Sequence, residues 1–98
     1  MKIGILKETA PGETRVALTP DVTKKYRKLG LEVLLESGAG STAGMSDAEF
    51  TEAGAQLVSR DVAAGADIVL KVVPPNENEV AKLKKGALLV CLLEPYRN

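Results

Sequence analysis

The chain has 98 residues, with 13 basic and 13 acidic side chains and therefore no net charge at pH 7. This length supports one domain of modest size. The balanced charge gives no electrostatic support for nucleic acid as a partner. The first apolar run is about six residues long, against the roughly 20 that span a bilayer, and no signal-peptide pattern follows. These features indicate a soluble, cytoplasmic protein.

Missing and rare residue types narrow the possible chemistry. The sequence contains no histidine, which excludes Ser-His-Asp catalysis, Cys-His catalysis and the common zinc sites within these residues. The single cysteine, Cys91, lies inside an apolar run. We interpret it as a small buried hydrophobe and not as a nucleophile.

The first elements in chain order are a strand, a loop and a helix. Residues 2–6 form a short, mainly apolar segment with β-branched side chains, which is typical of a strand. A long polar loop follows over residues 7–18. Thr19 and the proline after it begin a helix expected at residues 20–29, because a hydroxyl caps the first turn and proline presets its φ. A second strand is expected at residues 31–35.

The later elements continue the alternation. Ser46 and Glu49 form a capping box for a short helix that ends near Gly54. Beyond it we expect a brief strand at 55–58, a strand at 68–73, a helix at 77–84 with Val80 and Leu83 facing inward, and a strand at 87–93. The last strand is the most hydrophobic, so we expect it at the centre of the sheet. Apolar runs of this kind predict a doubly wound α/β fold, flavodoxin-like or Rossmann-like, with a mainly parallel sheet between two helical layers.

A glycine-rich loop at residues 38–44 allows two interpretations. Glycines after a strand can let the backbone approach a pyrophosphate at a helix N-terminus. However, the third glycine is one place late, the helix begins only after Ser46, and the loop follows the second strand instead of the first. We therefore favour a flexible loop without a nucleotide role.

Two cations are the candidate binding residues. Arg15 lies in the first polar loop, where its guanidinium offers a planar fork of donors to a carboxylate or phosphate. Lys71 lies near the carboxyl end of an apolar strand, where open α/β sheets place ligands and where an ammonium needs a partner or a polar cleft. Each could instead be an ordinary surface or edge residue. Together they suit a small carboxylate or an anionic group of a cofactor, and we assign no role to Glu8 or Glu13.

Four segments of the sequence carry a family resemblance. They are residues 2–8, 13–20, 36–40 and 66–72. In this order they resemble the N-terminus of the alanine dehydrogenase and proton-translocating NAD(P) transhydrogenase α-subunit family, over the whole chain. The resemblance implies that Arg15 and Lys71 correspond to the two cations that hold the substrate carboxylate in alanine dehydrogenases.

The resemblance also separates the two branches of the family. It implies a catalytic histidine at the end of the strand expected at 87–93, but this sequence has Glu94 there. Without that general acid and base, alanine oxidation lacks its proton carrier. The pattern therefore favours the transhydrogenase branch. An alanine dehydrogenase in which Glu94 replaces the histidine is an alternative, and so is a freestanding carboxylate-binding or assembly module.

In the transhydrogenase branch, the resemblance implies a protein that binds NAD(H) and exchanges hydride with NADP(H) on a partner subunit, coupled to proton translocation through membrane subunits. The NAD-binding domain of such a subunit lies beyond residue 98. Residues 1–98 are then a partial N-terminal domain with no catalytic, cofactor-binding or metal-binding residues of its own, and inactive alone. The expected partners are the rest of the α subunit, the membrane and NADP-binding subunits, and a second copy of the chain. The expected location is the cytoplasm, peripheral to the inner membrane.

Overall fold

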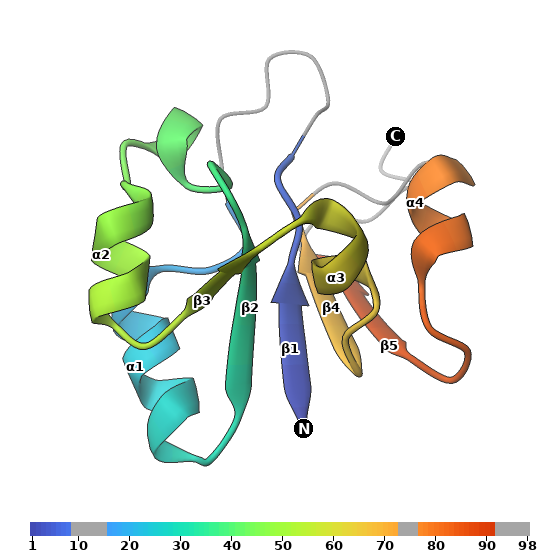
Figure 1. Ribbon diagram of the computed structural model, residues 1–98, viewed down its shortest axis with the longest axis horizontal. Helices are drawn as coiled ribbons and strands as arrows, with labels where there is room; N and C mark the ends of the chain where they lie inside the picture. Colours follow the sequence, from blue (N-terminus) through green and yellow to red (C-terminus); the bar gives the residue numbers. More distant parts are fainter. Residues whose placement is uncertain (9–15, 73–76, 92–98) are drawn as a thin grey trace, which may run out of the picture.

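The computed structural model describes residues 1–8, 16–72 and 77–91 of the chain. They form strands and helices in alternation (Figure 1). The elements are β1 (Lys2–Ile5), α1 (Pro20–Lys28), β2 (Glu32–Glu36), the 3-10 turn η1 (Ser41–Ala43), α2 (Asp47–Glu52), β3 (Gln56–Val58), α3 (Arg60–Ala64), β4 (Ile68–Lys71), α4 (Glu77–Lys82) and β5 (Leu88–Cys91). Among these described residues, no helix has both the length and the hydropathy to cross a bilayer.

The five strands form one sheet in the order β3-β2-β1-β4-β5, and every neighbouring pair is parallel. This order matches the first five strands of a doubly wound nucleotide-binding fold. The prediction of a doubly wound α/β fold is therefore confirmed. The chain builds outward from β1 through β2 to β3, and then returns to the other side of β1 with β4.

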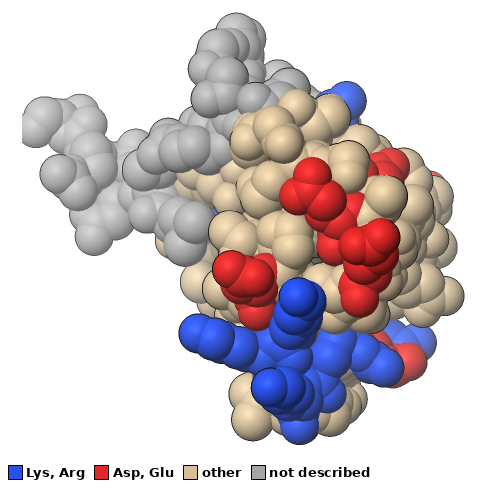
Figure 2. All heavy atoms as spheres, turned by 90° about the vertical axis from the view of Figure 1, so that its left-hand side faces the viewer, with Lys and Arg blue, Asp and Glu red and all other residues tan. Residues whose placement is uncertain are grey.

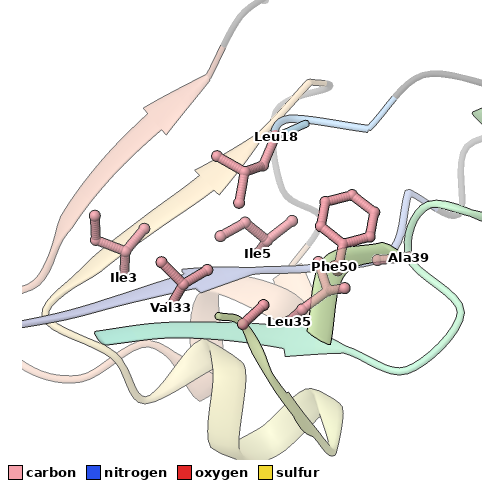
Figure 3. Close-up of a cluster of buried hydrophobic side chains, with 8 residues drawn as sticks. Ile3, Ile5, Leu18, Val33, Leu35, Ala39 and Phe50 are labelled. Carbon is pink, nitrogen blue, oxygen red and sulfur yellow. The ribbon is translucent and has the colours of Figure 1, made fainter. Parts of the chain in front are cut away.

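Side chains on one face of the sheet form the larger core cluster (Figure 3). Ile3 and Ile5 of β1 lie beside Val33 and Leu35 of β2, their register partners. Phe50 of α2 is fully buried against them. Because strand side chains alternate between faces, this set accounts for every second residue of both strands. Helices α1 and α2 cover this face, since α1 contacts β2 and α2 contacts β3.

The opposite face is built around small residues of α3. Ala63 and Ala64 are completely buried against Leu6, Leu34 and Val69. An ion pair between Asp61 of α3 and Lys82 joins α3 to α4, on the same side of the sheet.

Helix capping follows the sequence signals. The Thr19 hydroxyl accepts the Val22 backbone N–H at 3.2 Å. Ser46 and Glu49 form the predicted capping box of α2. These side chains satisfy backbone donors that the first helical turn leaves unpaired, so the predicted helix starts are confirmed.

Helix α3 was not expected from the sequence. It has only five residues, and its cap is Ser59, whose hydroxyl accepts the Val62 N–H. A helix this short leaves no repeating apolar pattern, because its buried face consists of two alanines. The Ser-x-x-Val spacing at its start was the available signal.

The strand expected at the centre of the sheet lies at its edge instead. Within the described part of the chain, β5 pairs with β4 alone. Leu88 is 58% exposed and Val90 is also exposed. Both lie on the face of the sheet that carries α1 and α2, but those helices contact mainly β2 and β3, at the other side of the sheet. The hydrophobicity of a strand indicates how much apolar surface it can bury, but it does not determine the position of the strand in the sheet. The central strand is β1.

Two side chains differ from expectation, one in a predicted helix and one in a predicted strand. Val80 of α4 is 52% exposed, so its inward orientation is wrong. Leu83, just after α4, does pack against the cluster formed by α3. Cys91 at the end of β5 is half-buried, so the expectation of full burial is also wrong.

The glycine-rich loop has structural reasons for its glycines. The Gly38 backbone N–H donates to the Asp47 carboxylate at 2.9 Å, and Gly38 has a φ of +80°. A Cβ on Gly40 would lie 2.5 Å from the Phe50 ring. The 3-10 turn η1 separates this loop from α2, which begins only at Asp47. The segment is a loop with internal backbone hydrogen bonds, and its lack of a nucleotide role stays a prediction.

Surface charge is divided between two neighbouring helices (Figure 2). Exposed Lys24, Lys25, Arg27 and Lys28 lie on α1, and exposed Glu49 and Glu52 lie on α2. The two helices contact one another. Basic and acidic groups on this face thus lie near one another, in keeping with the zero net charge of the chain.

Asp67 joins the amino ends of three strands. Its carboxylate accepts the Lys2 backbone N–H at 2.8 Å and pairs with the Lys84 ammonium at 2.5 Å. Its carbonyl accepts the Leu88 N–H at 2.9 Å. The Lys84 ammonium, followed by the Lys2 N–H, lowers the pKa of the Asp67 carboxyl below its ordinary value.

Asp67→Asn is expected to weaken the pH dependence of stability in acid. Since the folded pKa is lowered, the stabilisation is fully present above the unfolded value of about 3.9 and is lost as pH falls through the folded pKa. The variant should therefore be less stable at pH 7, and its unfolding free energy should fall less below about pH 4. Urea unfolding across the pH range measures this, and equal pH slopes in both proteins would contradict it.

Gly4→Ala is expected to be strongly destabilising. A Cβ on Gly4 would lie 1.9 Å from the carbonyl oxygen of Ala63, so β1 and α3 would have to separate. We expect a loss of about 2 to 3 kcal/mol in the free energy of unfolding. The matched control is Gly65→Ala, because a Cβ there meets its nearest atom at 3.5 Å and the residue has an ordinary φ of −83°. The control should change stability by less than about 1 kcal/mol. Equal losses would show that the close approach does not limit the fold.

Candidate functional site

The strand order reverses beside β1, at a position where a ligand is expected. The chain runs from β1 towards β2 on one side, and β4 follows on the other side. In open α/β sheets, ligands bind outside the carboxyl ends of the strands at this reversal. Here that position lies between the ends of β1 and β4. The residues that reach it are Glu8, just beyond β1, and Lys71, the last residue of β4.

Lys71 and Glu8 form a buried ion pair at this reversal. The Lys71 Nζ lies 3.3 Å from the Glu8 Oε1. Lys71 is 2% exposed and Glu8 is 6% exposed. The second oxygen of Glu8 accepts the backbone N–H of Val72 at 3.0 Å. A buried charge is tolerated only when it is paired and hydrogen-bonded. Here each residue supplies the counter-charge of the other, and the Val72 N–H adds a hydrogen bond to Glu8.

A second pair of charged side chains, Glu36 and Arg60, binds the backbone of Lys7, the residue before Glu8. The Lys7 backbone N–H donates to the Glu36 Oε1 at 2.9 Å, at the end of β2. The Lys7 carbonyl accepts from the Arg60 Nη2 at 2.9 Å, at the start of α3. Arg60 and Glu36 are also paired with each other at 3.2 Å. The backbone that leaves β1 is therefore held from β2, α3 and β4 together.

The predicted site residues fare differently. The structure places Lys71 at the carboxyl end of its strand, buried and paired, as the sequence indicated. Arg15, Glu13 and Glu94 lie outside the described residues. The meeting of Arg15 with Lys71 therefore stays a prediction.

Sequence reasoning assigned no role to Glu8, and this was wrong because Glu8 is the counterion of Lys71. The available signal was the buried lysine itself. A lysine inside an apolar strand requires a carboxylate, and Glu8 follows the neighbouring strand β1 by three residues. Glu36 and Arg60 were also missed, the latter because α3 was not predicted.

Two further observations describe the chemistry near the pair. Cys91 is the register partner of Lys71 on β5 and is half-buried. Among the residues that the structure describes, no group of three or more Cys, Asp or Glu side chains is arranged to hold a metal ion. The site as described offers an ammonium, a carboxylate and backbone groups.

The described residues thus form a doubly wound α/β domain with a buried, paired cation at its topological switch point. Residues 4–98 match the family described as alanine dehydrogenase/PNT, N-terminal domain. The chain belongs to this family.

Relatives from both branches of the family resemble the chain. It is 46% identical over its full length to the first segment of the NAD(P) transhydrogenase subunit alpha of Rhodospirillum rubrum, of which it covers 27%. It is 42% identical to the alanine dehydrogenase of Mycobacterium tuberculosis, over 95% of the chain and 26% of that protein. The chain thus spans about a quarter of the length of these relatives.

Solved structures agree with this assignment. The transhydrogenase from Sinorhizobium meliloti matches with a TM-score of 0.93 and 35% identity, over 98% of this chain and 29% of that one. An L-alanine dehydrogenase matches with a TM-score of 0.86 and 34% identity, over 93% of this chain and 26% of that one. The fold of the described residues is therefore the one that both enzymes share.

Lys71→Met is expected to be costly because it removes the ammonium that pairs with the buried Glu8 carboxylate. We expect a loss of about 3 to 5 kcal/mol in the free energy of unfolding. The double variant Lys71→Met/Glu8→Gln should recover part of this loss, since the remaining groups are neutral and the glutamine amide oxygen can still accept the Val72 N–H. Urea unfolding of the two variants, with the single Glu8→Gln variant, completes the cycle.

The matched control is Lys84→Met. Lys84 also pairs with a carboxylate, that of Asp67, but its side chain is 54% exposed. An exposed pair contributes less than about 1 kcal/mol. If Lys71→Met cost no more than Lys84→Met, the buried pair would not be the constraint that we describe.

Proposed function

We propose that the chain is the N-terminal segment of the α subunit of a proton-translocating NAD(P) transhydrogenase. The whole enzyme transfers hydride between NAD(H) and NADP(H) and couples this transfer to proton translocation. The observation that carries the proposal is the 46% identity to the Rhodospirillum rubrum α subunit over the entire chain. Glu94, at the position where the resemblance implies a catalytic histidine, supports this branch, because histidine is the usual proton carrier near neutral pH.

The proposal divides the work between this chain and the rest of the enzyme. NAD is bound by a domain beyond residues 1–98, which form a partial N-terminal domain without catalytic residues. The chain covers 27% of its Rhodospirillum relative, which leaves ample length for such a domain. The partners are the remainder of the α subunit, the membrane and NADP-binding subunits, and a second copy of the chain. The domain is cytoplasmic and reaches the inner membrane through those subunits.

The binding role within this chain falls to Lys71 and Arg15. We assign to them an anion, namely the carboxylate of a small substrate or an anionic group of the cofactor. Lys71 is supported by its burial, its fixed geometry and its place at the switch point. Arg15 is supported by the sequence alone, through the donors of its guanidinium. Their contribution is to bind and orient, because the nicotinamide supplies the hydride chemistry.

Alanine dehydrogenase activity is the second candidate. The identities of 42% to the Mycobacterium tuberculosis enzyme and 43% to that of Halomonas elongata favour it almost as strongly as the transhydrogenase relatives favour the first. It requires Glu94 to act as the general acid and base. A carboxyl with an ordinary pKa is a poor proton donor near neutral pH, which places this candidate second.

Sequencing the source gene beyond the codon for Asn98 and assaying the full protein distinguish the candidates. We expect the reading frame to continue into a glycine-rich nucleotide-binding segment. The full enzyme should then reduce an NADP analogue with NADH and should not reduce NAD with alanine. Alanine-dependent reduction of NAD would establish the second candidate. A stop codon after Asn98 would favour a freestanding binding module.

The 98-residue chain provides the matched control in the same assay. Purified alone, it should give no hydride transfer from NADH to the NADP analogue above the buffer rate. Steady turnover by this chain would contradict its proposed incompleteness.

A further inference from the structure

The Glu36 and Arg60 side chains form a closed set of hydrogen bonds with the backbone of Lys7. Their own contact is bidentate: the Arg60 Nη2 lies 3.2 Å from the Glu36 Oε1, and the Arg60 Nε donates to the Glu36 Oε2 at 3.3 Å. The same Oε1 accepts the Lys7 N–H at 2.9 Å, and the same Nη2 donates to the Lys7 carbonyl at 2.9 Å. One ion pair therefore holds both backbone groups of one residue.

This ion pair joins elements that are distant in the sequence. Glu36 is the last residue of β2, Arg60 is the first residue of α3, and Lys7 follows β1. The side chains are only 15% and 23% exposed, respectively, so water and salt screen their charges less than on an open surface. Hydrogen bonds from an ionised, planar guanidinium are also stronger and more directional than neutral ones. The Lys7 backbone is therefore fixed relative to both β2 and α3.

The position of Lys7 determines the position of Glu8. The Lys7 carbonyl lies in the same rigid peptide plane as the Glu8 nitrogen and Cα, so the Arg60 hydrogen bond sets the direction from which the Glu8 side chain starts. The Glu8 carboxylate lies 3.3 Å from the Lys71 Nζ and accepts the Val72 N–H at 3.0 Å. A rotation of that peptide plane would displace the carboxylate from both contacts.

We propose that Glu36 and Arg60 are positioning residues for the candidate anion site. They hold the Lys7 backbone, which places Glu8, and Glu8 in turn places the Lys71 ammonium. This role requires no contact between the ion pair and the ligand. The inference rests on the proposed binding role of Lys71, and it extends that site to residues of β2 and α3.

Three variants separate positioning from a general contribution to stability. Glu36→Ala removes the acceptor of the Lys7 N–H, whereas Glu36→Gln keeps it, because the glutamine amide oxygen still accepts a hydrogen bond. Arg60→Met removes the donor to the Lys7 carbonyl. We expect the glutamine variant to retain the function of the site and the other two variants to lose it.

The first measurement is an NMR titration of the isotope-labelled 98-residue chain. The probes are 2-oxobutanoate, which represents a substrate carboxylate, and inorganic pyrophosphate, which represents an anionic group of a cofactor. The comparison uses the probe whose binding Lys71→Met abolishes. Glu36→Ala and Arg60→Met should each raise its dissociation constant about tenfold, because a small displacement of a binding group is costly. Glu36→Gln should stay within about threefold of the wild type. An equal loss in Glu36→Gln and Glu36→Ala would overturn the inference.

The second measurement follows Glu8 without any ligand, through hydrogen exchange of the Val72 amide that donates to it. In Glu36→Ala, the Val72 amide should exchange about tenfold faster relative to the Leu70 amide, which lies within β4. A uniform loss of stability would accelerate both amides alike. An unchanged ratio of the two exchange rates would contradict transmission through Glu8.

Lys82→Met is the matched control. Lys82 pairs with Asp61, the residue after Arg60 in α3, so the variant removes a charged contact of the same helix without changing a partner of Lys7. Its dissociation constant and its Val72 exchange should match those of the wild type. A change as large as that of Arg60→Met would overturn the inference.

Lys71→Met separates the inference from the proposed function. If the wild-type chain bound neither probe, or if Lys71→Met bound both as the wild type does, the proposed role of Lys71 would fail, and the inference with it. If Lys71→Met lost binding but Glu36→Ala and Arg60→Met kept the wild-type dissociation constant, the inference alone would be overturned. Should those two variants not fold, Arg60→Lys replaces them, since lysine keeps the charge but lacks the planar fork of donors.

Discussion

The exit of β1 is fixed by charged side chains from both neighbouring strands, and the candidate site depends on this constraint. Glu36 and Arg60 hold the two backbone groups of Lys7, and the pair of Glu8 with Lys71 holds the next residue. Two consecutive residues are thus bound to β2, α3 and β4. The backbone of Lys7 and Glu8 is therefore held in a defined position at the switch point.

Stability alone does not explain the buried pair. Moving an ammonium and a carboxylate out of water costs several kcal/mol for each ion, and well-packed apolar residues of similar volume are often as stable or more so. The clusters on both faces of the sheet show that this chain can fill its interior with Leu, Val, Ile and Ala. The position of this charged pair, where the sheet topology favours a ligand, supports the binding role that we propose for Lys71.

The sequence predicted those features that depend on local chemistry. Thr19 and Ser46 marked helix starts because capping is a contact between near neighbours in the chain. Lys71 was identified because a charge in an apolar strand violates a strong rule. The errors concern contacts between distant residues. Glu8 and Lys71 lie 63 positions apart in the sequence, and β5 lies at the edge although its composition resembles that of a central strand. Helix α3 was missed because burial of two alanines leaves little periodic signal.

The same scaffold serves two chemistries in the family, since solved transhydrogenase and alanine dehydrogenase structures both match the chain closely. The fold therefore cannot decide between them, and the decision falls to the groups that carry protons and charge. Alanine oxidation must move a proton, which requires a group that titrates near neutral pH. Direct hydride exchange between two nicotinamides needs positioning and exclusion of water, but no such group. In these 98 residues, Glu94 stands where the resemblance implies the histidine, and Lys71 is held in place at the switch point. Both features support the transhydrogenase branch that we propose.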